Sequence, residues 1–366
     1  MRIAFLAPIK PPDHPIPSGD RLIGGNTVAA LAMAGFDVRL ASRFIAYSKR
    51  ADDGILVARK REALAEAEAA IARLRDAPPD LVFTYHPYCK APDWIGPRVA
   101  AAFGVPYVTL EAARTGQGFE EGGDRWARWR AEAQAGFAAA ALHITMKPTD
   151  RAMLRAVLGA DAPLADLSPF IDVPPAPAPA PHDPNGPPRL VTAAMMRPGK
   201  KALNFALLSD AMTRLADRDW TLDIVGGGPE EDDVRAAFAP LGGRVRLLGE
   251  RTHEGVLDAM AAGDLFVWPG LREPIGMVYL EAQAMGLPVA ALADMGVPLV
   301  VRDGETGRLS ERHDAEGLAA VIGELLDDPA ERLRLAGNSR DAVMRDHSLE
   351  AASQRLHALL SPLMGG

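Results

Sequence analysis

Short apolar segments alternate with longer amphipathic segments along most of the chain. Short apolar runs joined by amphipathic helices are typical of parallel strands connected by crossover helices. The pattern therefore predicts an α/β fold with two doubly wound, Rossmann-like halves. The predicted strands of the first half are residues 2–8, 37–42, 81–86, 107–112 and 142–146, and those of the second half are residues 189–195, 221–227, 245–249, 265–270 and 288–293.

The alternation stops in the proline-rich stretch `PPAPAPAPHDPNGPP`, residues 174–188. Proline removes backbone donors and favours an extended conformation, so we interpret this stretch as a linker. It separates a first domain, residues 1–173, from a second domain, residues 189–346. The run `HSLEAASQRLHALLSPL` predicts a C-terminal helix within residues 347–366, whose apolar stripe is expected to dock on the first domain. In such folds ligands bind beyond the carboxyl ends of the strands, so we expect the site in a cleft between the two halves.

The composition narrows the functional classes. A net charge of -8 gives no general reason for nucleic-acid binding, which needs clustered Lys and Arg. Cys89 is the only cysteine, which excludes an intramolecular disulfide and is compatible with a reducing compartment. No stretch reaches the roughly 18 to 20 apolar residues that span a bilayer, and the first apolar run is interpreted as a buried strand rather than a signal peptide. We therefore expect a cytoplasmic protein.

The stretch `REPIGMVYLEAQAMGLPV` contains two glutamates, Glu273 and Glu281, on either side of a predicted helix start at Gly276. On one regular helix, side chains eight residues apart point about 80° apart. The spacing makes more sense if Glu273 lies in the loop before the helix and Glu281 lies inside it. The first free N–H groups, near Gly276 and Met277, suit a phosphate, and Glu281 is then in reach of hydroxyls beside it. The alternative is that Glu281 is an ordinary solvated helix residue.

This stretch resembles the retaining glycosyltransferases of family 4, which have the GT-B fold. That family carries two glutamates with seven residues between them, followed by an `EA-A-G-PV` signature, as in `EPIGMVYLEAQAMGLPVAA` here. The resemblance covers nearly all of the second half and is weaker in the first. It implies that Glu273 lies beside the donor sugar as a catalytic residue and that Glu281 binds the nucleotide ribose.

The resemblance extends to two loops of the second half. In `MMRPGKKALNF` it implies that Arg197 and Lys201 hold the donor diphosphate, with Lys200 as a substitute for Lys201. The glycine turn in `LDIVGGGPE` lacks the third glycine of a dinucleotide fingerprint, which argues against NAD. In the family this turn lines the donor cleft, a role that would fall to Gly227, although a tight strand-to-helix connection explains it equally well.

In the first half, the loop `PIPSGDRLIGGN` follows the first strand. Ser18 and Gly19 are expected to present backbone donors to the donor phosphate, and Arg21 to add charge at the cleft. His86 ends the third strand, where the family often has a histidine close to the reacting sugar, and we assign it a catalytic role beside the alternative of a structural histidine. Glu111 ends the next strand and is expected near the acceptor.

Two further features bear on partners and metals. Trp126 and Trp129 share a helical face among three arginines, which suits a membrane surface or a sugar acceptor, or plain packing against the domain. Asp217 and Asp219 form the only Asp-x-Asp, but they precede a strand and read as a turn rather than a metal site. We expect no metal and no cofactor.

Two departures from the family pattern concern the pocket for the donor sugar. Ile275 replaces an aromatic residue, and Met295 and Leu299 replace members of a double glycine plus glutamate.

Together these observations predict a metal-independent, retaining glycosyltransferase that uses a UDP-, GDP- or ADP-sugar. On the family's proposed front-side mechanism the leaving diphosphate takes the acceptor proton, and no protein nucleophile is needed. A nucleotide-sugar epimerase or phosphorylase of GT-B fold, and a nucleotide-sugar-binding protein without turnover, stay open as alternatives.

Overall fold

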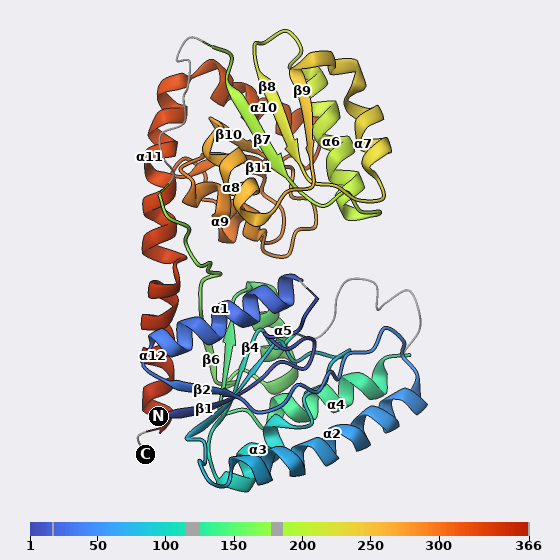
Figure 1. Cartoon of the computed structure of the whole chain (residues 1–366), viewed down its shortest axis with the longest axis vertical. Coiled ribbons are helices and arrows are strands. Elements are labelled where there is room, and N and C mark those ends of the chain that lie inside the picture. The colour runs from blue at the N-terminus through green and yellow to red at the C-terminus, as the bar shows by residue number, and fades with distance from the viewer. Residues whose placement is uncertain (17, 114–124, 177–185, 365–366) are drawn as a thin grey trace. The chain divides into compact units, whose positions relative to one another are not determined.

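A computed structural model describes residues 1–16, 18–113, 125–176 and 186–364 (Figure 1). The chain divides into two compact units, residues 1–168 with 349–366 and residues 169–348. The second unit thus begins before the proline-rich stretch. Residues 177–185, in the middle of the predicted linker, lie outside the described residues, and the linker stays a prediction.

Unit 1 contains a six-stranded parallel sheet in the order β2-β1-β3-β4-β5-β6. The central strands β3 and β4 are buried along their whole length, as expected where helices cover both faces of a parallel sheet. The strands are β1 Arg2–Leu6, β2 Asp37–Leu40, β3 Leu81–Tyr85, β4 Tyr107–Leu110, β5 Leu142–Thr145 and β6 Leu164–Asp166. The helices are α1 Gly19–Met33, α2 Asp53–Leu74, α3 Gly96–Phe103, α4 Ala127–Ala138, α5 Pro148–Leu158 and α12 Leu349–Met364.

The C-terminal helix α12 packs against α1 in unit 1 (Figure 1). His357 on α12 stacks on Phe36, and its Nδ1 lies 3.0 Å from the carbonyl oxygen of Ala34. Leu356 and Leu360, one turn apart, are fully buried. The apolar stripe of α12 is therefore covered by the unit that contains the N-terminus.

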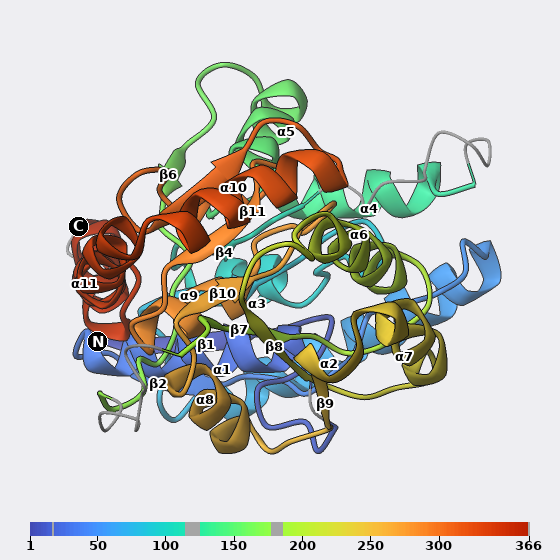
Figure 2. The same ribbon diagram turned by 90° about the horizontal axis from the view of Figure 1, so that it is seen from above.

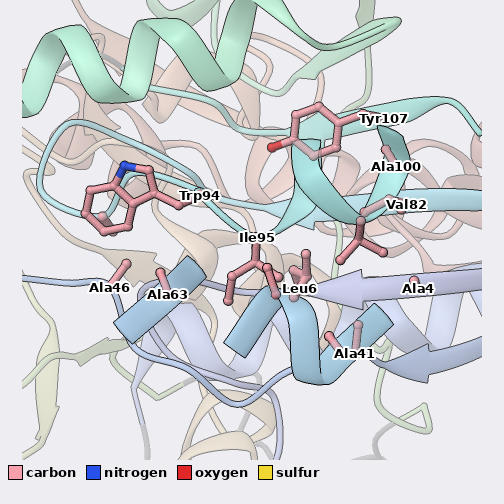
Figure 3. Close-up of a cluster of buried hydrophobic side chains, with 14 of the residues drawn as sticks. Ala4, Leu6, Ala41, Ala46, Ala63, Val82, Trp94, Ile95, Ala100 and Tyr107 are labelled. Carbon is pink, nitrogen blue, oxygen red and sulfur yellow. The ribbon is translucent and has the colours of Figure 1, made fainter. Parts of the chain in front are cut away.

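Apolar side chains from β1, β3 and the segment around α3 fill the core of unit 1 on one face of the sheet. Figure 3 shows Ile95 over Leu6 and near Val82, with Trp94 toward Ala63. All of these belong to one buried cluster. This packing fixes the strands whose carboxyl ends carry the predicted residues of the first half.

Unit 2 repeats the architecture with a parallel sheet in the order β12-β11-β10-β7-β8-β9. Helix α6 packs against both α7 and α10, and α9 packs against α11 (Figure 2). The strands are β7 Arg189–Ala193, β8 Thr221–Val225, β9 Val245–Gly249, β10 Leu265–Val267, β11 Val289–Leu292 and β12 Gly307–Ser310. The helices are α6 Lys200–Arg214, α7 Glu231–Phe238, α8 His253–Ala261, α9 Met277–Ala284, α10 Ala315–Asp327 and α11 Pro329–Asp346, with short 3-10 turns at Ala239–Arg244 and Val297–Leu299.

The predicted fold class is confirmed, because both sheets are parallel and doubly wound. Each of the ten predicted strands is present. The prediction missed two strands, β6 and β12, which lie at the edges of their sheets.

Candidate functional site

The first turn of α9 begins at a glycine with a left-handed backbone. Gly276 has φ 83° and ψ 58° and is the N-cap of α9. A Cβ at this position would lie 2.5 Å from the ring of Tyr279, one turn into the helix. Tyr279 is itself fixed, because it is fully buried and its hydroxyl donates to the carbonyl oxygen of Trp268 at 3.2 Å. Only glycine fits here, and it leaves the first N–H groups of α9 open to a ligand.

Gly276→Ala is therefore expected to lower the free energy of unfolding by about 1–3 kcal/mol, from left-handed strain and the clash with Tyr279. Gly337→Ala is the control, because Gly337 lies in α11 with nothing near its Cβ position, and it should stabilise the protein by about 0.5–1 kcal/mol. Urea unfolding monitored by tryptophan fluorescence measures both. Equal stabilities of the two variants would contradict the steric argument.

The loop before α9 is held from two sides. The side-chain amide of Asn204 on α6 donates to the carbonyl oxygen of Leu271 at 3.1 Å, and its oxygen accepts from the N–H of Leu271 at 2.8 Å. On the other side, Arg272 N–H donates to the Asp294 carboxylate at 2.6 Å, and Gly296 N–H donates to the carbonyl oxygen of Glu273 at 3.0 Å. These bonds position Glu273 without help from its own side chain.

Glu273 in this loop forms an ion pair with Lys201, the second residue of α6. Lys201 Nζ lies 2.8 Å from Glu273 Oε2, and the two side chains are 27% and 22% exposed. The same ammonium lies 5.3 Å from the ring centroid of Trp268. Lys200 is exposed, and its Nζ lies 3.4 Å from the carbonyl oxygen of Arg272, the residue before Glu273. Of the two lysines, the structure brings Lys201 to Glu273, while Arg197 is exposed on the segment that leads into α6.

Glu281 lies on the second turn of α9 and is mostly buried. Its side chain is 18% exposed, and His253 Nδ1 at the start of α8 is 3.9 Å from its Oε1. Burial raises the pKa of the Glu281 carboxyl, and the nearby His253 charge opposes this only in part. Such burial does not fit the solvated alternative. The Glu281 carboxylate is mostly buried but still partly exposed, so it can accept hydrogen bonds from a ligand.

The glycine turn after β8 is built for close packing against the segment after β7. A Cβ on Gly226 would collide with the carbonyl oxygen of Ala194, and one on Gly228 with that of Met196. Gly227 is different, since a Cβ there would make only ordinary contacts with Glu250 and Glu231. Tight connection therefore explains Gly226 and Gly228, and the predicted role of Gly227 at the donor stays a prediction.

The predicted phosphate loop of unit 1 is an N-terminal cap. Ser18 caps α1, and its hydroxyl accepts from Arg21 N–H at 3.2 Å. Gly19 is the first residue of α1, while the Arg21 guanidinium donates to the carbonyl oxygen of Pro12 at 3.3 Å. Asp20 also lies in this first turn, and a carboxylate there competes with an anionic ligand for the positive helix end. Phosphate binding by Ser18 and Gly19 stays a prediction.

His86 and Glu111 occupy equivalent positions at the ends of β3 and β4. Both have a left-handed backbone, with φ 55° and 56°. His86 Nδ1 lies 3.0 Å from an oxygen of Asp20, and Glu111 is 2% exposed with its carboxylate 2.9 Å from Lys147 Nζ. The sequence did not single out Asp20 or Lys147 for these positions.

The tryptophan pair is explained by packing. Trp129 on α4 is fully buried, and its ring lies 5.7 Å from the half-buried ring of Trp126. Trp129 therefore does not face a membrane surface. Across the described residues, no helix is both long and apolar enough to span a bilayer, and no three metal-binding side chains gather closely enough to hold an ion.

Most of unit 2 matches the model of a known protein family. Residues 187–328 match the family model "Glycosyl transferases group 1". Unit 2 contains a group 1 glycosyltransferase domain. The matched segment holds Glu273, Glu281 and Lys201, so the resemblance inferred from the two glutamates is confirmed for this part of the chain.

Curated relatives of the group 1 glycosyltransferase domain match over a similar length. A GDP-mannose-dependent monoacylated alpha-(1-6)-phosphatidylinositol monomannoside mannosyltransferase of Corynebacterium glutamicum is 36% identical over 149 residues, which cover 39% of this chain and 39% of the relative. The lipopolysaccharide core biosynthesis glycosyltransferase LpsE of Rhizobium meliloti is 34% identical over 159 residues, covering 43% and 46%. The matched region thus covers less than half the length of each of these relatives.

Solved structures agree in fold over the whole chain. HepE of Anabaena in complex with UDP has a TM-score of 0.70 at 18% identity, covering 99% of this chain and 100% of HepE. Sucrose-phosphate synthase of Thermosynechococcus elongatus has a TM-score of 0.71 at 20% identity, covering 99% and 98%. The chain therefore has the GT-B fold.

Proposed function

We propose that the protein is a glycosyltransferase that moves a sugar from a nucleotide-diphosphate sugar to an acceptor hydroxyl, with retention at the anomeric carbon and without a metal. The observation that carries the proposal is the arrangement around the first turn of α9. The Lys201–Glu273 ion pair lies before this turn, and the mostly buried carboxylate of Glu281 lies one turn further along the helix. These groups flank a helix N-terminus, which is suited to binding a diphosphate.

In this proposal the diphosphate binds to the N–H groups at Gly276 and Met277. Lys201 on α6, and Arg197 from the segment that leads into α6, add positive charge. The diphosphate gains negative charge as the bond to the sugar breaks, so these groups stabilise the transition state more than the bound donor. The helix end acts in the same direction.

The two glutamates then have different tasks. Glu273 is held at the sugar by the backbone bonds of its loop, and its carboxylate faces the positive charge that develops at the anomeric carbon. Glu281 accepts hydrogen bonds from the ribose hydroxyls, which supply the partners that its buried carboxylate needs. Two similar proteins support the donor class, since one is a GDP-mannose-dependent mannosyltransferase and HepE was solved in complex with UDP.

Cys89, the only cysteine of the sequence, is buried and forms no intramolecular disulfide. This is compatible with a reducing compartment, and the proposal places the reaction in the cytoplasm.

A thermal-shift panel with UDP, GDP, ADP and NAD tests the donor site. One nucleoside diphosphate is expected to stabilise the wild type, by roughly 2.7 kcal/mol at 100 times its dissociation constant. The shift should be lost in Glu281→Ala and retained in Glu324→Ala, an exposed glutamate on α10. The stabilising ligand identifies the base. Stabilisation by NAD alone, or by none of the four, would contradict the proposal.

Metal independence is tested in the same panel with EDTA. The nucleotide shift and the release of nucleoside diphosphate from its sugar are both expected to persist after treatment with the chelator. Loss of release that is restored by added Mg²⁺ or Mn²⁺ would contradict the metal-free reaction. Nucleotide binding without any release would instead favour a non-catalytic binding protein.

A further inference from the structure

The turn that follows β11 contains a methionine in a strained conformation. Met295 has a left-handed backbone with φ 44°, a conformation that a residue other than glycine adopts at a cost in free energy. It is the second residue of a turn that Val297 N–H closes on the carbonyl oxygen of Asp294 at 3.0 Å. The family pattern has a glycine in this stretch, and glycine adopts a left-handed backbone without strain. A methionine therefore occupies a position that suits glycine better.

Hydrogen bonds tie this turn to the loop that carries Glu273. Arg272 N–H donates to the Asp294 carboxylate at 2.6 Å, and Gly296 N–H donates to the carbonyl oxygen of Glu273 at 3.0 Å. Gly296 also packs closely on the loop, because a Cβ there would collide with the carbonyl oxygen of Pro274. Strained backbone persists where surrounding structure imposes it, and such positions gather at ligand sites.

The turn is held on its other side by the end of β12. Ala293 N–H donates to the carbonyl oxygen of Ser310 at 2.8 Å, and His313 Nε2 lies 3.1 Å from the carbonyl oxygen of Ala293. Since β10, β11 and β12 are neighbours in the sheet, this turn lies at the carboxyl edge next to the loop after β10. Met295 is thus fixed beside the loop in which Glu273 is expected to face the donor sugar.

The Met295 side chain gains little burial in return for this strain. It is 46% exposed, so packing within the protein does not explain it. Leu299, four residues further on, is half-buried where the family pattern has a glutamate. Both departures replace a small or charged residue with an apolar side chain. An exposed apolar side chain that is held at a ligand site is available to cover an apolar part of the ligand.

The chemistry of methionine indicates which part of a sugar it would cover. Its thioether donates no hydrogen bond and accepts only weakly. A sugar hydroxyl that packs against it loses water without gaining a partner, whereas a methyl group gains free energy from burial. Removal of the exocyclic hydroxyl at C6 of a hexose leaves a methyl group, while removal of a ring hydroxyl leaves only a methylene. The sugar class that fits best is therefore a 6-deoxyhexose.

We propose that Met295 determines donor specificity and that the preferred donor carries a 6-deoxyhexose, whose methyl group lies on the Met295 thioether. This inference rests on the function proposed above, in which Glu273 lies beside the donor sugar. An apolar wall discriminates only moderately against an added hydroxyl, by about 100-fold at most. Hexose donors are therefore expected to bind as well, but more weakly.

Calorimetry with nucleotide sugars that differ by one oxygen atom tests the preference. The pairs are UDP-glucose with UDP-6-deoxyglucose, GDP-mannose with GDP-6-deoxymannose, and ADP-glucose with ADP-6-deoxyglucose. In one pair, wild type is expected to bind the 6-deoxy member about 10- to 100-fold more tightly. Equal affinities within every pair, tighter binding of the hexose, or no binding of any of the six would overturn the proposal.

Met295→Ala removes the thioether and keeps the left-handed strain. It should bind both members of the pair with nearly equal affinity, whereas Met295→Leu, which stays apolar, should keep most of the preference. Met344→Ala is the matched control, because Met344 is 45% exposed on α11, and it should keep the full preference. A wild-type preference in Met295→Ala would overturn the proposal.

Met295→Gly separates specificity from a role in holding the turn. It should lose the preference and melt at a higher temperature than wild type, because glycine relieves the left-handed strain. A lower melting temperature would show that the methionine holds the turn itself and would overturn the proposal.

The two proposals fail separately. If one pair binds with the expected preference but no nucleoside diphosphate is released, the role of Met295 stands and the transfer reaction fails. If nucleoside diphosphate is released from a donor but no pair shows a preference, the transferase function stands and the role of Met295 fails.

Discussion

Glu273→Gln is expected to lower kcat about 10²- to 10³-fold, the usual cost of losing one charge-stabilising group at a reacting centre. The substitution keeps the size of the side chain and removes the negative charge that, in the proposed reaction, faces the anomeric carbon. Nucleotide affinity should change much less, because the proposal assigns the phosphate and ribose contacts to other residues. Initial rates of nucleoside diphosphate release at saturating donor, with nucleotide affinity from calorimetry, measure the two effects.

Glu324→Gln on α10 is the matched control for Glu273→Gln. Its side chain is 62% exposed, so both kcat and affinity should stay at wild-type values. The ion pair of Glu273 with Lys201 is partly exposed, so its loss should change stability by no more than about 1 kcal/mol. A Glu273→Gln variant with wild-type kcat, or one whose defect lies mainly in nucleotide affinity, would contradict the assigned role.

Glu281→Gln is expected to weaken nucleotide binding about 10- to 100-fold, the usual worth of a hydrogen bond to a charged group. The same change should stabilise the free protein at neutral pH. Burial raises the pKa of Glu281 in the folded state, so the ionised carboxylate is unfavourable there. A raised carboxyl pKa favours folding below the unfolded value of 4.5, and this contribution is lost as pH rises through the folded pKa.

The free energy of unfolding of Glu281→Gln should therefore exceed that of wild type at pH 7, and the difference should vanish below about pH 4.5. Urea unfolding from pH 4 to pH 8 measures this, and calorimetry with the stabilising nucleoside diphosphate measures the affinity. Glu324→Gln again serves as the control for affinity. If Glu281→Gln were less stable than wild type at pH 7, the carboxylate would be a structural group rather than one held open for a ligand.

The parts of the fold with strong local patterns were predictable. Most of the ten predicted strands contain a run of apolar residues, and the start of α9 at Gly276 and its end before Gly286 follow from the glycines that bound it. The strands β6 and β12 were not found, because both are short, three and four residues long, and lack an apolar run.

The candidate site was predictable only where its residues lie close together in the sequence. Glu273 and Glu281 lie within one loop and helix, so their spacing already carries the arrangement. The pairing of Lys201 with Glu273 joins residues 72 positions apart, and Asn204, which fixes the same loop, looks like any polar helix residue. Its only sequence signal is an asparagine among apolar positions of α6.

The charged pairs at the carboxyl ends of β3 and β4 were still less visible in the sequence. Asp20, on the helix after β1, meets His86 because β1 and β3 are adjacent in the sheet, and Glu111 meets Lys147 because β4 and β5 are adjacent. The sequence placed His86 and Glu111 at strand ends but could not show their left-handed backbone. It also could not show that the Tyr85 hydroxyl is buried without a partner among the described residues.

The most direct test of the account is cleavage of nucleotide sugars with water as the acceptor, which needs no knowledge of the natural acceptor. UDP-glucose, GDP-mannose and ADP-glucose are each incubated with wild type and with Glu273→Gln, and proton NMR follows the released sugar and nucleoside diphosphate. The account predicts slow release from one donor by wild type, with the α anomer appearing first, and a far slower release by Glu273→Gln. No release from any donor, or equal release by the two proteins, would contradict it.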